Sequence, residues 1–147
     1  MTTDESGESL LELLIAVAIM GIAVVAIMAG LVTSVLVSDV HRKQATAGTA
    51  VRDYAEAIQT FVANGNYVDS CGSITPYNLP SFTVPTGYTK SVVAGSVRYW
   101  SGSSWQTSCA TDLGLQRLIL QVASNDGRAS ERVTVVLRKP CGLDTSC

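Results

Sequence analysis

Two hydrophobic patterns follow one another between the N-terminus and Ala63, and the first is apolar on every side. From Leu13 to Ser38 no side chain is charged, and most are Leu, Ile, Val, Ala or Met. About 20 helical residues cross the ~30 Å hydrocarbon core of a bilayer, so this run is long enough to span a membrane with some tilt. A buried helix in a soluble protein is the alternative, but a chain of 147 residues offers little core in which to bury it. We expect a transmembrane helix.

The second pattern is amphipathic and runs from Asp39 to Ala63. Its apolar positions recur at intervals of three and four residues, with polar and charged residues mainly between them; they are Val40, Ala47, Val51, Tyr54, Ile58, Phe61 and Val62. This spacing predicts that the helix continues beyond the membrane and lays an apolar stripe on a domain. Asn64-Gly65 is a typical C-terminal stop, and Gly48 is where we expect any bend or break.

Neither periodicity continues into residues 64–87. This stretch contains Pro76, Pro80 and Pro85, and it is predicted to be a loop that crosses a surface. Strand signals come after it and are typical of short antiparallel strands. They lie at Tyr88 to Val93 and Ser96 to Ser101, on either side of Ala94-Gly95, and at Trp105 to Cys109.

The clearest hairpin signal lies near the end of the chain, where Leu115 to Ser124 and Ala129 to Arg138 flank Asn125-Asp126-Gly127. Apolar residues alternate along both strands and give each one an apolar face, formed by Leu118, Leu120 and Val122 in the first strand and by Val133, Val135 and Leu137 in the second. The expected fold class is α+β. A long N-terminal helix, membrane-spanning in its first half, would pack its amphipathic stripe on a small antiparallel sheet of about four strands.

Composition changes this picture mainly through the cysteines, which all lie outside the predicted helix: Cys71, Cys109, Cys141 and Cys147. They lack the paired C-x-x-C spacing of a zinc site, and four cysteines in a small loop-rich domain are typical of two disulfides and an oxidising compartment. Three connectivities are open. We favour Cys71–Cys109, which ties the proline-containing loop to the sheet, and Cys141–Cys147, which closes a short C-terminal loop. Free thiols in a cytosolic domain are the alternative.

Charge and motifs exclude several classes of function. The net charge of −2 offers no electrostatic footprint for nucleic acid, so we expect no nucleic-acid partner. His41 stands alone, without cysteines or carboxylates at ligand spacing, and no nucleophile elbow or phosphate-binding glycine loop is present. We therefore expect no enzyme, no cofactor and no metal. Asn125-Asp126-Gly127 is explained by a turn.

An aromatic cluster is the one candidate for ligand stacking. Tyr99, Trp100 and Trp105 lie near Lys90 and Arg98 in the sequence, and such residues can stack on a sugar or a base. Core packing or strand pairing accounts for them more simply.

Glu12 is the ionisable residue just past the start of the apolar run. In one interpretation it forms a capping box with Ser9, in which each side chain bonds the backbone N–H of the other residue. In the other, a carboxylate at the edge of the bilayer waits for a cationic partner from another chain.

The segment Gly7 to Ile15, GESLLELLI, followed by a long apolar helix, resembles the N-terminus of type IV pilins and of the pseudopilins of type II secretion. The resemblance covers residues 7 to about 37. It implies that a prepilin peptidase cuts after Gly7 and methylates the new N-terminal residue, Glu8. It also implies that Glu12 pairs with the N-terminal amine of a neighbouring subunit. The implied partners are other pilin or pseudopilin subunits, a membrane assembly platform with its cytoplasmic ATPase, and the lipid bilayer before assembly.

Two features set this N-terminus apart. Glu8 stands where Phe or Met is usual, and the leader contains Asp4 and Glu5 but no basic residue. A secretory signal peptide is the competing interpretation, but it would need a basic n-region and a shorter apolar run. Arg42 and Lys43 taken alone would place the C-terminal domain in the cytoplasm by the positive-inside rule, and the cysteines overrule that signal.

The expected organisation is a leader at residues 1–7, an assembly helix at 8–38 and an extracytoplasmic domain at 39–147. Within the domain we expect a helix continuation at 39–63, a loop at 64–87, a sheet at 88–140 and a disulfide loop at 141–147. The predicted function is a structural subunit of a type IV pilus-like or type II secretion-like filament. It would be anchored in the bacterial cytoplasmic membrane with its C-terminal domain outside, and would reach the cell surface after assembly. A single-pass anchored binding module that never polymerises is the alternative.

Overall fold

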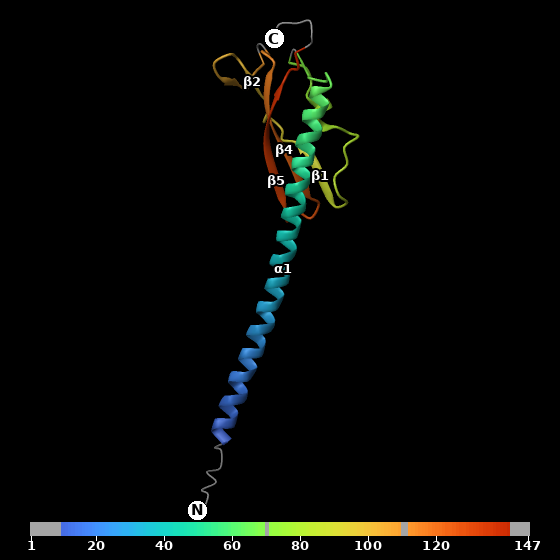
Figure 1. The fold of residues 1–147 in the computed structure, drawn as a ribbon. Helices are drawn as coiled ribbons and strands as arrows, with labels where there is room; N and C mark the ends of the chain where they lie inside the picture. Colours follow the sequence, from blue (N-terminus) through green and yellow to red (C-terminus); the bar gives the residue numbers. More distant parts are fainter. Residues whose placement is uncertain (1–9, 70, 110–111, 142–147) are drawn as a thin grey trace, which may run out of the picture. The chain divides into compact units, whose positions relative to one another are not determined.

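The computed structural model describes residues 10–69, 71–109 and 112–141 (Figure 1). The chain divides into two compact units, Met1–Asp39 and Val40–Cys147. The elements, in chain order, are the helix α1 (Leu10–Ala63), the 3₁₀ helix η1 (Thr75–Asn78), and the strands β1 (Tyr88–Val92), β2 (Arg98–Trp100), β3 (Trp105–Gln106), β4 (Leu115–Ser124) and β5 (Ser130–Arg138). The predicted α+β class is confirmed, with five antiparallel strands where about four were expected.

In the first unit, α1 exposes every described side chain up to Ser38. Among the described residues, α1 is the helix whose length and composition suffice to cross a membrane. The hydroxyl of Thr33 donates to the carbonyl oxygen of Ala29 at 3.0 Å, so this polar group is satisfied within its own helix. Such internal pairing is what an apolar solvent requires of a helix that enters it.

In the second unit, the amphipathic stripe of α1 is confirmed from Ala47 to Val62, whereas the predicted stripe residue Val40 is half-buried and lies outside the core. The residues that α1 buries are Ala47, Ala50, Val51, Tyr54, Ala55, Ile58 and Val62, while Phe61 is partly buried against the same core. The helix continues unbroken through Gly48, the position at which any break was expected. A Cβ there would meet only the Cγ atom of Glu131 at 3.9 Å, so this glycine is not required by close packing.

The predicted stop at Asn64-Gly65 forms a Schellman motif. Gly65 has φ +87°, and its N–H donates to the carbonyl oxygen of Val62 at 3.0 Å. The N–H of Asn66 donates to the carbonyl oxygen of Phe61 at 3.4 Å. Because these two bonds satisfy carbonyls of the last turn and need a left-handed residue between them, glycine ends α1 where the sequence indicates.

Strand β4 is the centre of the sheet. The hairpin of β4 and β5 is confirmed, with Leu115 opposite Arg138 and Ala123 opposite Ser130. Its apolar faces are also as expected, since Leu118, Leu120, Val122, Val135 and Leu137 are buried and Val133 is partly buried.

The other edge of β4 pairs with two strands in succession. Val92 of β1 lies opposite Leu120, and Arg98 of β2 lies opposite Arg117. Ala94-Gly95 therefore does not turn the chain back on itself, and β1 and β2 are two parts of one interrupted edge. Across the interruption, the N–H of Val93 donates to the carbonyl oxygen of Ile119, whose own N–H donates to the hydroxyl of Ser96 at 3.1 Å.

The core lies between the second unit's part of α1 and one face of the sheet (Figure 1). The proline-containing loop covers one side of this core with the buried side chains of Tyr77 and Leu79. The ring of Phe82, in the same loop, stacks on that of Tyr54 with 5.5 Å between centroids. In the part of the chain that the structure describes, no helix covers the opposite face of the sheet.

Candidate functional site

Glu12 lies in the first turn of α1 and is exposed. A carboxylate there interacts favourably with the partial positive charge at a helix N-terminus. Its neighbours Leu11 and Leu13 are also exposed, by 69% and 54%, so the charge sits within an apolar surface. Gly7, Glu8 and the predicted capping partner Ser9 lie outside the described residues. The capping and assembly interpretations of Glu12 therefore both remain predictions.

The apolar surface of the first unit is large. Its Leu, Ile, Val and Met side chains between Leu10 and Val37 are exposed by 43% at the least, at Val24, and by 89% at the most, at Leu10. Soluble monomers rarely expose contiguous apolar patches of more than a few hundred Å². This surface therefore suits an apolar environment, such as lipid or other apolar helices.

The favoured bond Cys71–Cys109 is present and joins the segment after α1 to the segment after β3, with 5.6 Å between the Cα atoms. Cys71 has φ +62°, a left-handed conformation that costs a residue with a Cβ about 1–2 kcal/mol. Cys141 is also disulfide-bonded, and the described residues contain no free cysteine. The favoured pairing of Cys141 with Cys147 lies outside the described residues, because Cys147 does.

A partly buried polar network fastens the proline-containing loop to the sheet. The hydroxyl of Tyr67 donates to Asp112 Oδ1 at 2.9 Å. The side-chain amide of Gln116 donates both to Asp112 Oδ2 and to the carbonyl oxygen of Val68, each at 2.7 Å. The hydroxyl of Tyr77 donates to Gln116 Oε1 at 3.0 Å. No buried side-chain polar atom among the described residues lacks a partner.

Burial explains the acid–base properties of this network. It raises the pKa of Tyr67, and the neighbouring Asp112 carboxylate raises this pKa further. Burial also raises the pKa of Tyr54 to about 12, while its hydroxyl donates to the carbonyl oxygen of Tyr77 at 2.7 Å. These phenols are thus held as neutral donors that fix the loop. Sequence reasoning missed the network, although Gln116 on the apolar face of a strand was a signal for it.

Lys90 does not belong to an aromatic ligand platform. Its ammonium donates to the carbonyl oxygen of Leu79 at 2.8 Å and to that of Phe82. It also lies 5.5 Å and 5.7 Å from the ring centroids of Phe82 and Tyr54. Burial lowers the pKa of Lys90, and the carbonyls and rings stabilise its charge. This lysine holds the proline-containing loop against the helix and β1.

The other aromatic candidates are divided between the two faces of the sheet. Tyr99 lies opposite Gln116, whose side chain is on the face covered by α1. Trp100 lies opposite Trp105 on the open face, where their rings meet edge-on with 5.3 Å between centroids. The guanidinium of Arg117 lies 5.1 Å from the Trp105 ring centroid. The predicted cluster of three is therefore a pair of tryptophans with an arginine.

The turn between β4 and β5 is tied to α1. Lys43 Nζ lies 2.5 Å from Asp126 Oδ2, and the hydroxyl of Ser124 and the N–H of Arg128 both donate to Asp126 Oδ1. The bond from Lys43, followed by that from Ser124, lowers the pKa of Asp126. The turn interpretation of Asn125-Asp126-Gly127 is therefore incomplete, because Asp126 also pairs with the helix. His41 is exposed on α1.

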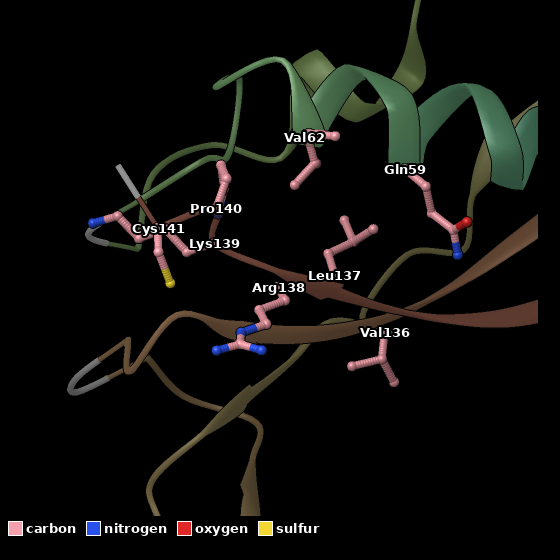
Figure 2. A pocket seen from close by; sticks show the side chains of 9 residues that line it. Gln59, Val62, Val136, Leu137, Arg138, Lys139, Pro140 and Cys141 are labelled. Atoms are coloured by element: carbon pink, nitrogen blue, oxygen red, sulfur yellow. The ribbon is translucent and has the colours of Figure 1, made fainter. Parts of the chain in front are cut away.

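A hollow of about 400 Å³ lies where α1 and β5 end (Figure 2). Val62 and Leu137 point toward each other across it, whereas Val136 and Arg138 project from the other side of β5. Cys141 at its rim is disulfide-bonded and so offers no nucleophile. Within the described ranges, no group of three or more His, Cys, Asp and Glu side chains is placed to hold a metal ion.

Comparison with known proteins bears on the N-terminal helix. Residues 3–28 match the family model of the prokaryotic N-terminal methylation motif. No curated protein and no solved structure matches the chain. The matched segment includes Glu12 and the first turns of the exposed apolar helix, so the motif and the geometry concern the same residues. The resemblance noted in the sequence is thereby confirmed, and the chain carries at residues 3–28 the N-terminal methylation motif that is the signature of type IV pilins and pseudopilins.

Proposed function

We propose that this protein is a structural subunit of a type IV pilus-like or type II secretion-like filament. The observation that carries the proposal is the coincidence, in one segment, of the methylation motif at residues 3–28 with an apolar helix that exposes every described side chain up to Ser38. A helix of this kind needs a bilayer or a bundle of equivalent helices around it. A subunit that moves from membrane to filament uses both in turn.

Processing precedes assembly in this proposal. The prepilin peptidase removes residues 1–7 and methylates the amine of Glu8. Glu12 of one subunit then pairs with the N-terminal ammonium of a neighbour. Each charge alone would be costly among apolar helices, so the pair fixes the axial register of neighbouring subunits. A membrane assembly platform and its cytoplasmic ATPase drive the extraction from the bilayer.

The second unit lies outside the cytoplasmic membrane in this proposal. Support comes from the Cys71–Cys109 disulfide and the further disulfide at Cys141, because such bonds persist in oxidising compartments. The role is structural rather than enzymatic, as it is for the proteins that carry this motif.

The proposal is tested by the N-terminus of the protein extracted from membranes. Intact-mass measurement and N-terminal sequencing should find a chain that begins at a methylated Glu8. A host lacking the prepilin peptidase is the control, and there the chain should keep residues 1–7. An intact Met1 or Thr2 start in the peptidase-positive host would refute the proposal and favour the anchored binding module that does not polymerise.

A further inference from the structure

The open sheet face, defined here by Arg98, Arg117, Arg138, Trp100 and Trp105, has an unusual composition for a surface without a partner. Arg98 and Arg117 are directly opposite each other on β2 and β4. Leu115 is opposite Arg138, which places Arg138 diagonally beside Arg117 on the same face. Trp100 and Trp105 extend this face onto β2 and β3. Tryptophan and arginine are the residues most enriched at the energetic centres of protein interfaces.

The arginines do not stabilise the isolated domain by pairing with acids. Like charges directly opposite each other on neighbouring strands are destabilising. Arg98 Nη1 bonds only the carbonyl oxygens of Gly95 and Val97, and Arg117 contacts the Trp105 ring. In the part of the chain that the structure describes, no carboxylate pairs with Arg98, Arg117 or Arg138. Within the described residues, the positive charge of this face therefore has no acidic partner.

A complementary surface exists on the same domain. The outer helix face, defined here by Thr49, Asp53 and Glu56 of α1, is exposed and faces away from the core. Asp53 and Glu56 are one turn apart, and neither makes an ion pair with another described residue. Asp53 also borders a groove of about 530 Å³ whose other wall includes the apolar side chains of Phe82, Val84 and Pro85. The outer helix face is thus complementary to the open sheet face in two ways. Its carboxylates are opposite in charge to the arginines, and its apolar groove can accept a tryptophan.

We propose that the open sheet face of one copy docks on the outer helix face of a second copy. The arginines would pair with Asp53 and Glu56, and a tryptophan would enter the groove beside Asp53. The two surfaces lie on opposite sides of the helix-on-sheet domain, so the contact is heterologous and each copy leaves one of each surface free. This inference rests on the proposed function and adds to it a lateral contact between the domains that follow the assembly helix.

The arrangement also predicts an open-ended assembly rather than a closed dimer. A contact between two different surfaces closes into a ring only for special rotations and otherwise continues as a helical filament. Exposed ion pairs are individually weak, but anchoring in one filament raises the effective concentration of each domain beside the next. The contact would thus form after the helices assemble and would fix the rotation of each domain.

Photo-crosslinking in cells tests the docking. A benzophenone amino acid is placed at Thr134, which is exposed on β5 and lies on the open sheet face opposite Ile119. The same probe at Ile22 of α1 reports contacts between assembly helices. We expect both probes to give two-copy products, and mass spectrometry should map the Thr134 product to the segment of a second copy that contains Thr49, Asp53 and Glu56.

Charge swaps make the test specific. Arg138→Glu and Glu56→Lys should each lower the Thr134 product by about five-fold or more, which is the effect of roughly 1 kcal/mol, and the combined variant should restore it. Arg138 is exposed and makes no ion pair with another described residue, so we expect its substitution to leave the fold intact. Arg128→Glu, in the exposed β4–β5 turn, makes the same change of net charge outside the face. It removes the ion pair between Arg128 and Asp126 at 3.8 Å, but it should leave the yield of the Thr134 product unchanged.

Each failure has its own signature. If the Ile22 product forms but the Thr134 product is absent, maps elsewhere or ignores the charge swaps, the docking is refuted and the proposed function stands. If neither product forms and residues 1–7 are retained, the proposed function is refuted, and so is the docking that rests on it. If the Thr134 product is absent and the purified protein binds a single-stranded oligonucleotide in a way that Arg117→Glu abolishes, the face serves a polyanion and the docking is refuted.

Discussion

Removal of the Cys71–Cys109 bond is the perturbation whose magnitude the structure defines best. The bond closes a loop with a sequence separation of 38 residues. In the chain-entropy model, a loop of that length restricts the unfolded chain by about 4 kcal/mol at 25 °C. That is a large fraction of the 5–15 kcal/mol by which a domain is usually stable. The double variant Cys71→Ser with Cys109→Ser should therefore lose about 4 kcal/mol of the free energy of unfolding.

The native structure should survive this change. The hydrogen bonds from Tyr67 to Asp112 and from Gln116 to Val68 still hold the loop, so the loss acts mainly through the unfolded chain. Unfolding of the detergent-solubilised protein can be followed by tryptophan fluorescence, because Trp100 and Trp105 lie in β2 and β3. We expect an unchanged native spectrum and a midpoint about 15 °C lower, at roughly 4 °C per kcal/mol for a domain of about 100 residues.

Two results would contradict this reasoning. A loss of less than about 1 kcal/mol would mean that the unfolded chain is already restricted without the bond. A changed native spectrum would mean that the loop depends on the bond for its conformation, and that the polar network is insufficient. Wild-type protein treated with reductant is a comparison with a larger expected loss of stability, because reductant opens the disulfide at Cys141 as well as the Cys71–Cys109 bond.

Three further predictions concern processing, assembly and pH. Gly7→Val should accumulate uncut precursor on an immunoblot, because a peptidase that binds an extended backbone beside the membrane leaves no room for a Cβ; normal maturation would exclude cleavage at this glycine. Glu12→Gln should be cleaved and inserted but lose about 3–5 kcal/mol per subunit contact and be outcompeted by wild type in filaments, and adding Glu8→Gln should worsen the defect; normal incorporation of the double variant would rule out charge pairing as the source of register. Lys43 lowers the pKa of Asp126 in the folded state, so the ionised Asp126 stabilises the fold at pH values above its ordinary pKa of 3.8. This stabilisation is lost as the pH falls below 3.8, so Asp126→Asn should weaken the dependence of the free energy of unfolding on pH in the acid range.

Most of the fold could be predicted from local sequence patterns. The 3.6-residue period of the stripe around Tyr54 and Ile58, with Gly65 as the stop, was enough to place the second half of α1. Strict alternation around a short turn was enough to place β4 and β5. Both signals depend on neighbours within a few residues, so they can be read without knowing the rest of the structure. The methylation motif is local in the same sense, and its match to residues 3–28 confirms it.

Contacts between distant segments escaped this reasoning. The residues near Ala94-Gly95 do not indicate that both flanking strands pair with β4. That pairing depends on β4, which lies about 20 residues further along the chain. Lys90 looks like an exposed strand residue until the carbonyls of Leu79 and Phe82 are known to meet it. The Tyr67–Asp112 bond likewise joins residues 45 apart in sequence.

Strand β5 has a consequence for how such a subunit avoids fusing with others through its backbone. It pairs only with β4 among the described strands, so its outer N–H and C=O groups could add a strand from another molecule. Arg132 and Arg138 flank this edge with charge, and Pro140, which has no N–H to donate, follows the end of the strand. These features discourage edge-to-edge strand addition. In the proposed filament, a subunit held beside copies of itself could thus assemble through its helix and side chains without forming a continuous β-fibre.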